Sequence, residues 1–248
     1  MKILLLTGIQ EELTPLFKIH PFEFDRHSRF YRSIEVPEII AGTTGPGVKR
    51  KRDLEKLLEY FIPDVIINAG LVGILNDDDP IKVGDLLKVG NVLDSKTEKI
   101  YPGGPGKDTI VTVDHPIFQP WEKMDLHMQF DRARACDMEA ANLLKFIGSL
   151  DHISKHTDII FCKVAGDKPE SYLLYEHEHL VRNWNKKSFL EKVKTSFVFP
   201  GGPARLARLL NEKDNALKSL TKHINNTITR LLILKHIPPN MHSVFIPH

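Results

Sequence analysis

Three carboxylates in the sequence stand at the borders of apolar segments. Glu12 follows the first apolar run of the chain, Glu139 lies near the start of a helix-like segment, and Asp167 closes a strand-like run. A carboxylate at a strand end can orient a water or a sugar hydroxyl, and a buried carboxyl with a raised pKa can hold a proton for a leaving group. Acids also favour helix N-termini and serve as helix caps. Each position taken alone therefore leaves both interpretations open.

A turn-forming segment, Thr-Thr-Gly-Pro-Gly at residues 43–47, offers a second kind of polar group. Thr44 and Gly45 lie just before a predicted helix. Backbone N–H groups and hydroxyls ahead of a helix can bind an anion or a water. A plain turn explains the same residues equally well.

Strand-like and helix-like segments alternate along the first 170 residues. We predict strands at residues 2–7, 38–42, 65–69, 83–93, 109–113 and 158–164, and helices at residues 10–18, 48–61 and 137–147. Continuous apolar runs are typical of strands covered on both faces, and the strand at 65–69 is expected to end in a glycine turn that begins at Gly70. The alternation predicts an α/β fold with a largely parallel or mixed sheet, helices on its faces and sites at the carboxyl ends of strands.

The last quarter of the chain is basic, with 12 Lys and Arg against 3 Asp and Glu from residue 182 onward. An anionic partner such as nucleic acid or a membrane surface is one explanation. Aromatic residues are not interleaved with these charges as single-strand binding favours, so we prefer a solvated face that complements the acidic remainder. We predict one domain over residues 1–248, with a basic helical extension from about 182 that contains a long helix after Gly202, broken near Asp214.

Composition narrows the class of protein. With 42% hydrophobic and 27% charged residues the chain is typical of a globular protein, and no segment approaches the ~20 apolar residues of a membrane helix. The two cysteines lack the spacing of a metal or redox motif, which favours a cytoplasmic location. No cofactor is expected. No metal is expected either, because the paired histidines at 152/156 and 177/179 lack a clustered third ligand.

Taken in order, these pieces resemble the nucleoside phosphorylase superfamily, most closely its methylthioadenosine/S-adenosylhomocysteine nucleosidase branch. The resemblance covers residues 1 to about 170. It rests on Met1-Lys2-Ile3, Gln10-Glu11-Glu12, the glycine turn at 45–47, Pro-Asp-Val-Ile-Ile-Asn-Ala-Gly at 63–70, Lys-Val-Gly-Asp at 82–85, Met138-Glu139-Ala140 and Gly166-Asp167. It implies a three-layer α/β/α domain that assembles as a dimer or trimer, and an enzyme that cleaves the N-glycosidic bond of a purine-type nucleoside.

The resemblance also implies roles for individual residues. Glu12 would position the attacking water, Met138 and Glu139 would contact the ribose, and Asp167 would protonate N7 of the purine. The other predicted substrate-binding residues are Thr44, Gly45, Gly70, Phe118 and Lys163. Cleavage passes through a cationic sugar, so a carboxylate beneath the sugar and an acid at the base stabilise complementary charges.

Several positions depart from the nucleosidase pattern and keep alternatives open. Leu71 and Gly166 stand where the family usually has Ser, and Lys163 stands where it has Arg. The leading hypothesis is hydrolysis of a methylthioadenosine-like or futalosine-like nucleoside. Phosphorolysis is the first alternative, although Asn68 occupies the position where hexameric phosphorylases have an Arg. A non-catalytic ligand-binding protein is the second.

Overall fold

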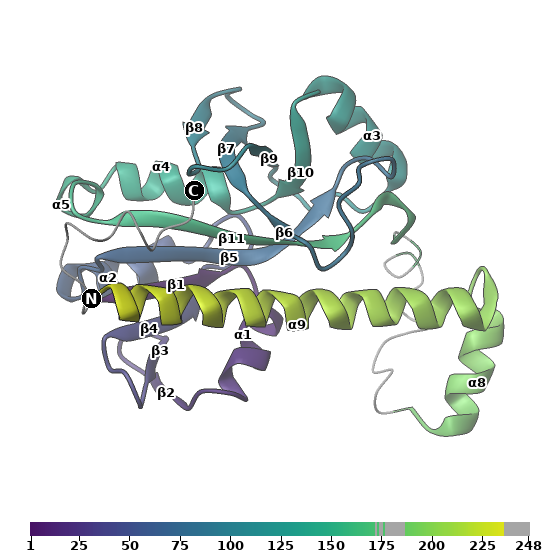
Figure 1. Cartoon of the computed structure of the whole chain (residues 1–248), viewed down its shortest axis with the longest axis horizontal. Coiled ribbons are helices and arrows are strands. Elements are labelled where there is room, and N and C mark those ends of the chain that lie inside the picture. Colours follow the sequence, from purple (N-terminus) through teal and green to yellow (C-terminus); the bar gives the residue numbers. More distant parts are fainter. Residues whose placement is uncertain (172, 174–175, 177–186, 236–248) are drawn as a thin grey trace.

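The computed structural model describes residues 1–171, 173, 176 and 187–235, and one mixed sheet forms its centre (Figure 1). The sheet has 11 strands in the order β2-β3-β4-β1-β5-β10-β9-β7-β8, and β11 pairs with β5 and β6. The strands are β1 (Ile3–Thr7), β2 (Phe22–Asp25), β3 (Phe30–Ser33), β4 (Ile39–Thr43), β5 (Val65–Ile74), β6 (Leu86–Leu87), β7 (Val89–Asp94), β8 (Ile100–Pro102), β9 (Asp108–Thr112), β10 (Ala133–Asp137) and β11 (Asp158–Asp167).

Helices cover both faces of the sheet, which confirms the predicted α/β fold with a mixed central sheet. They are α1 (Gln10–Phe17), α2 (Lys51–Tyr60), α3 (Pro120–Gln129), α4 (Ala140–Gly148), α5 (Asp151–Ser154), α8 (Phe189–Val198) and α9 (Gly202–Leu234), with a 3-10 turn η1 (Pro169–Ser171) after β11. Helices α1 and α9 pack on one face of β1, β4, β5 and β11, and α2, α4 and α5 pack on the other face of the same region. No helix of the described residues is long and apolar enough to cross a bilayer.

Helix α9 runs along the strands of the sheet as one continuous element (Figure 1). Its buried side chains Leu220, Ile224, Ile228 and Leu231 belong to the same core as β1 and β5. The predicted break near Asp214 is absent because the apolar stripe continues through Ala216, which is buried against the domain. The helix therefore contributes to the core of the domain.

The predicted turn at Gly70 is absent, and the strand that begins at Val65 does not end at residue 69. Instead β5 continues to Ile74, because β11 pairs with it in parallel from Asp158 opposite Val65 to Asp167 opposite Gly73. Backbone pairing with a long neighbour thus keeps the glycine-containing segment extended. Gly70 consequently lies inside the sheet.

Other boundaries also differ from the sequence prediction. The expected strand at 83–93 is a turn followed by β6 and β7, and β7 forms a hairpin with β8, which was not predicted. The expected helix at 137–147 begins only at Ala140, because residues 133–137 form β10 between β9 and the end of β5. Glu139 is therefore the N-cap of α4.

Candidate active site

Glu12 is buried in the first turn of α1, where its carboxylate binds the backbone after β1 and the backbone of β5. One oxygen, Oε2, accepts hydrogen bonds from the backbone N–H groups of Gly8 (3.1 Å) and Ile9 (3.2 Å), as an acid in the first turn of a helix often does. The other, Oε1, accepts from the N–H of Leu71 on β5 at 2.8 Å. A Cβ on Gly70 would lie 3.1 Å from Oε1, so glycine lets the carboxylate approach the strand closely.

Glu139 approaches the same place from the start of α4. Its Oε1 lies 2.8 Å from the point where a Cβ on Gly8 would stand, so only glycine leaves room for it there. Its carboxylate also accepts a hydrogen bond from the backbone of Gly47, in the turn after β4. Gly8 thus lies against both Glu12 and Glu139, and the structure brings these two predicted residues together.

A buried ion pair lies next to the two glutamates. Lys163 on β11 is 1% exposed, and its Nζ lies 2.8 Å from Oδ2 of the buried Asp137 at the end of β10. Asp137 also accepts a hydrogen bond from the hydroxyl of Thr112 at 2.7 Å and one from the N–H of Ala140 at 3.0 Å. The partners of Asp137 therefore come from β9, β11 and the start of α4. We call Glu12, Asp137, Glu139 and Lys163 the carboxylate cluster.

Burial and like charge change the acidity of the carboxylate cluster. Burial raises the pKa of Glu12, although its three backbone hydrogen bonds and Lys163 oppose the shift. Burial and the neighbouring Asp137 raise the pKa of Glu139 to about 7. Burial alone would lower the pKa of Lys163, but the three carboxylates around it outweigh this effect and raise it. With all three carboxyls ionised the cluster carries more negative than positive charge, and the raised pKa values of Glu12 and Glu139 mean that this excess shrinks as pH falls.

Asp167 ends β11, four residues beyond Lys163, and has a partner that the sequence did not indicate. Its Oδ2 lies 2.6 Å from Nζ of Lys123 on α3, and Lys123 is completely buried. Burial raises the pKa of Asp167, and Lys123 opposes that shift. About 15% of the Asp167 side chain stays exposed.

The remaining predicted residues lie at several places. The Thr44 hydroxyl is buried and donates to the carbonyl oxygens of Thr7 (3.2 Å) and Gly45 (3.3 Å). Gly45 has a left-handed backbone, with φ 72°, in the turn that also holds Gly47. Met138 directly precedes Glu139 and is partly buried, whereas Phe118 lies before α3 with 39% of its surface exposed. Contact of Phe118 with a base stays a prediction.

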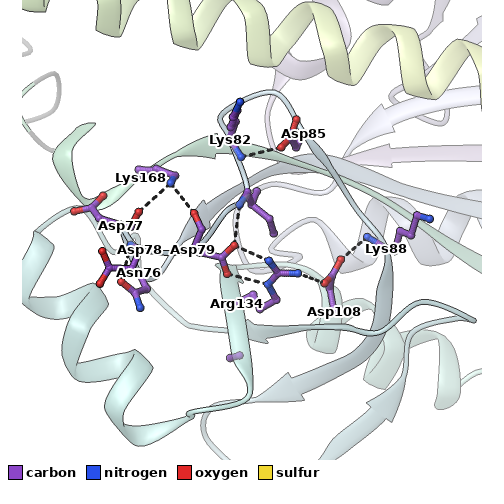
Figure 2. Close-up of polar contacts among 12 residues, drawn as sticks. Asn76, Asp77, Asp78, Asp79, Lys82, Asp85, Lys88, Asp108, Arg134 and Lys168 are labelled. Atoms are coloured by element: carbon purple, nitrogen blue, oxygen red, sulfur yellow. Dashed lines mark hydrogen bonds and ion pairs between the residues drawn. The ribbon is translucent and has the colours of Figure 1, made fainter.

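The loop after β5 is held by ion pairs of Arg134 and by hydrogen bonds from Lys168, the residue that follows Asp167 in the chain (Figure 2). Arg134 on β10 donates to both oxygens of Asp79, at 2.6 and 2.8 Å, and to Asp108 at 2.6 Å. Lys168 donates to the carbonyl oxygens of Asp77 (3.1 Å) and Asp79 (2.9 Å). Hydrogen bonds from Arg134 hold the pKa of Asp79 below its usual range.

A cavity of about 230 Å³ adjoins this network, and it is lined by Asn76, Asp78, Asp79, His127, Asp131, Ala133 and Arg134. Its lining includes no residue of the carboxylate cluster and does not include Asp167. We assign the candidate active site to the carboxylate cluster and Asp167, because the predicted residues Glu12, Glu139 and Lys163 gather there, and we assign the Arg134 network to support of the adjoining loop.

Replacement of Arg134 by Met is expected to lower the free energy of unfolding by about 1–3 kcal/mol, because two mostly buried aspartates lose a charged donor. Chemical denaturation measures the change. Lys96→Met is the matched control, since it breaks an exposed pair with Asp114 that is worth less than ~1 kcal/mol. Equal small losses in the two variants would show that the Arg134 network does not hold the loop.

Among the described residues no group of three His, Cys, Asp or Glu side chains is arranged to hold a metal ion. His177 and His179 lie outside the described residues.

No model of a known protein family matches the chain, and no curated protein matches it in sequence. Solved structures do match. The chain is similar to the 5′-methylthioadenosine/S-adenosylhomocysteine nucleosidase of Neisseria meningitidis in complex with methylthio-immucillin-A, with a TM-score of 0.61 and 14% identity over 91% of this chain and 99% of that chain.

Two further structures match in the same way. The futalosine hydrolase of Helicobacter pylori gives a TM-score of 0.60 at 14% identity, covering 91% of this chain and 98% of that one. The nucleosidase of Colwellia psychrerythraea 34H in complex with adenine gives 0.58 at 16% identity, covering 89% and 96%. The chain therefore has the fold of these nucleosidases along nearly their whole length, which confirms the predicted resemblance at the level of the fold.

Proposed function

We propose that this protein is a nucleosidase that hydrolyses the N-glycosidic bond of a purine-type nucleoside, either methylthioadenosine-like or futalosine-like. One observation carries the proposal. Glu12 and Glu139 are far apart in the sequence, but both carboxylates lie against Gly8 at the end of β1. The absence of a side chain at Gly8 and Gly70 lets the two carboxylates come this close to the strands. The similar solved structures, a methylthioadenosine nucleosidase and a futalosine hydrolase among them, support the same reaction class.

In the proposed reaction Glu139 accepts hydrogen bonds from the ribose hydroxyls and Asp167 holds a proton near the base. The C1′–N9 bond breaks with its electron pair passing to the base, and the proton of Asp167 passes to N7. A water that Glu12 orients attacks C1′ and gives a proton to Glu12. The carboxylates of the cluster, in their ionised form, stabilise the cationic sugar that forms between these events.

The charge of the site favours water over phosphate as the nucleophile. Phosphate binding requires Arg or Lys donors to replace its hydration shell. The ammonium of Lys163 is already paired with Asp137 and lies near Glu12 and Glu139, and Asn68 on β5 is uncharged. Phosphate would be repelled by the buried carboxylates, whereas a neutral water would not.

The test is release of free base from a panel of purine nucleosides, followed by chromatography in phosphate-free buffer and in phosphate. We expect free ribose or a 5′-substituted ribose at the same rate in both buffers. Strict dependence on phosphate with a ribose 1-phosphate product would establish phosphorolysis instead. Nucleoside binding without base release would establish the non-catalytic alternative.

Four other features remain predictions. The resemblance to nucleosidases predicts an assembly of two or three copies, and the cysteine content favours the cytoplasm. The basic segment from about residue 182 is expected to complement acidic protein surface, without binding nucleic acid or membranes. The contacts of Thr44, Gly45, Gly70, Met138, Phe118 and Lys163 with substrate are predicted from the same resemblance.

A further inference from the structure

Helix α3 exposes large apolar side chains and buries a lysine. Trp121, Met124 and Met128 are 60%, 58% and 68% exposed, whereas Lys123 is completely buried. An amphipathic helix that served only to pack would place these residues the other way round. Burial of an ammonium is costly unless it is paired, so the position of Lys123 calls for a reason beyond packing.

The partner of Lys123 is the proposed catalytic acid. Its Nζ lies 2.6 Å from Oδ2 of Asp167, within charge-assisted hydrogen-bond distance. Gly73 makes room for the pair, because a Cβ there would lie 3.1 Å from Oδ1 of Asp167, 3.2 Å from Nζ of Lys123 and 3.3 Å from Sγ of Cys136. The missing side chain of Gly73 on β5 thus leaves the space that the ion pair fills.

We propose that Lys123 is a positioning residue for Asp167, which fixes Oδ2 and stabilises the carboxylate left when Asp167 gives its proton to the leaving base. This inference rests on the proposed function. In this proposal the proton that reaches N7 comes from Asp167. As negative charge grows on Asp167 in the transition state, the attraction between the two side chains grows with it.

Burial and Lys123 act on Asp167 in opposite directions. Burial raises the pKa of Asp167, which keeps a proton available, while the ammonium lowers it and makes the proton easier to release. Within the part of the chain that the structure describes, the ionisable groups that act on Asp167 or lie against it are Lys123 from α3 and the Cys136 thiol from β10, whose own pKa burial raises to about 12. Lys168, next in the chain, donates to carbonyl oxygens of the loop at 77–79. Lys123 is therefore the charge whose removal is expected to move the titration of Asp167.

The experiment replaces Lys123 by Met and by Arg in the full-length protein. In Lys123→Met the titration midpoint of Asp167, followed by NMR with ¹³C-carboxyl aspartate and assigned by its loss in Asp167→Asn, should rise by about 1–3 units. The alkaline limb of the pH profile of kcat should move upward with it, and kcat should fall at least about 10-fold. Lys123→Arg keeps the charge and should lie closer to wild type in both measurements.

Two further variants separate positioning from a structural role. In the Asp167→Asn background, Lys123→Met should cause little further loss of kcat, because its effect acts through Asp167. Lys145→Met, which breaks the Lys–Asp pair between α4 and β7, should leave the pH profile unchanged.

An Asp167 midpoint and an alkaline limb that stay in place in Lys123→Met would overturn the proposal, even if kcat falls. If the midpoint rises while the wild type releases no base from any nucleoside, control of Asp167 by Lys123 is supported and the proposed function is what fails. The NMR titration needs no substrate, so the two failures are distinguishable.

Discussion

Asp167→Asn is expected to lower kcat about 10²–10⁴-fold, the range that a positioned general acid contributes. The asparagine amide can still donate a hydrogen bond to N7 of the base, but it cannot transfer a proton as the C1′–N9 bond breaks. The electron pair of that bond then stays on an anionic base, which is a poor leaving group. Base release by the best nucleoside substrate, measured from pH 5 to 9, should show the loss together with disappearance of the alkaline limb.

The substitution also leaves the buried Lys123 opposite a neutral amide, so a fall in stability is expected and has to be separated from the loss of chemistry. Asp94→Asn is the matched control, because Asp94 is a buried aspartate whose oxygen lies 3.0 Å from Nζ of Lys145, and neither residue belongs to the carboxylate cluster. That control should retain near-wild-type kcat. Near-wild-type kcat in Asp167→Asn itself would remove Asp167 from the mechanism.

The strands that carry the site could be predicted because their sequences satisfy a simple physical condition. The first strand is buried along its whole length and the strand that ends at Asp167 is buried at residues 162–165, and a continuous apolar run has few other ways to remove itself from water. The same condition locates Glu12 and Asp167 at strand ends. It does not show which strand ends meet, and the approach of both Glu12 and Glu139 to Gly8 depends on the sheet order.

The elements that escaped prediction are those whose local sequence argues against them. Helix α3 has its lysine inside and its tryptophan outside, so its apolar pattern points to the wrong face. Strand β10 is short and contains Arg134, which the Asp79 and Asp108 carboxylates neutralise. Lys123 could therefore not be assigned to Asp167 from spacing. One signal was available in the sequence. Lys123 lies among helix-forming residues and on a different face of the helix from Trp121 and Met128.

Gly70 shows why a glycine after a strand does not always mark a turn. A glycine after a β-rich run predicts a turn when only local conformation is considered. Here Gly70 stays extended because pairing with Lys163 on β11 continues past it, and its missing Cβ serves the approach of Glu12. Close approach of a side chain to a strand is a tertiary requirement that no local pattern contains.

Glu12→Gln is the second substitution with a large expected effect, a fall in kcat of about 10²–10⁴-fold. Burial raises the pKa of Glu12, and a carboxylate with a raised pKa is a stronger base for the proton that the attacking water releases. Glutamine can accept a hydrogen bond from water through its carbonyl oxygen but cannot take the proton at pH 7. Hydrolysis should therefore slow most at pH values where Glu12 of the wild type is ionised, and the difference should shrink as pH falls through its raised pKa, while nucleoside binding is largely kept.

Glu11→Gln is the control, because Glu11 lies next to Glu12 in the first turn of α1 but is 69% exposed. It should change kcat little. A loss as large as that of Glu12→Gln would show that disturbance of helix α1, and not loss of the Glu12 carboxylate, lowers kcat.

Stability gives an independent check of burial. A carboxyl whose pKa is raised in the folded state stabilises the protein fully below its unfolded pKa, near 4.5, and loses that contribution as pH rises through its folded pKa. The free energy of unfolding of the wild type, measured relative to Glu12→Gln, should therefore fall as pH rises above about 4.5. A difference that does not depend on pH would show that Glu12 titrates normally and would deprive the water-activating role of its physical basis.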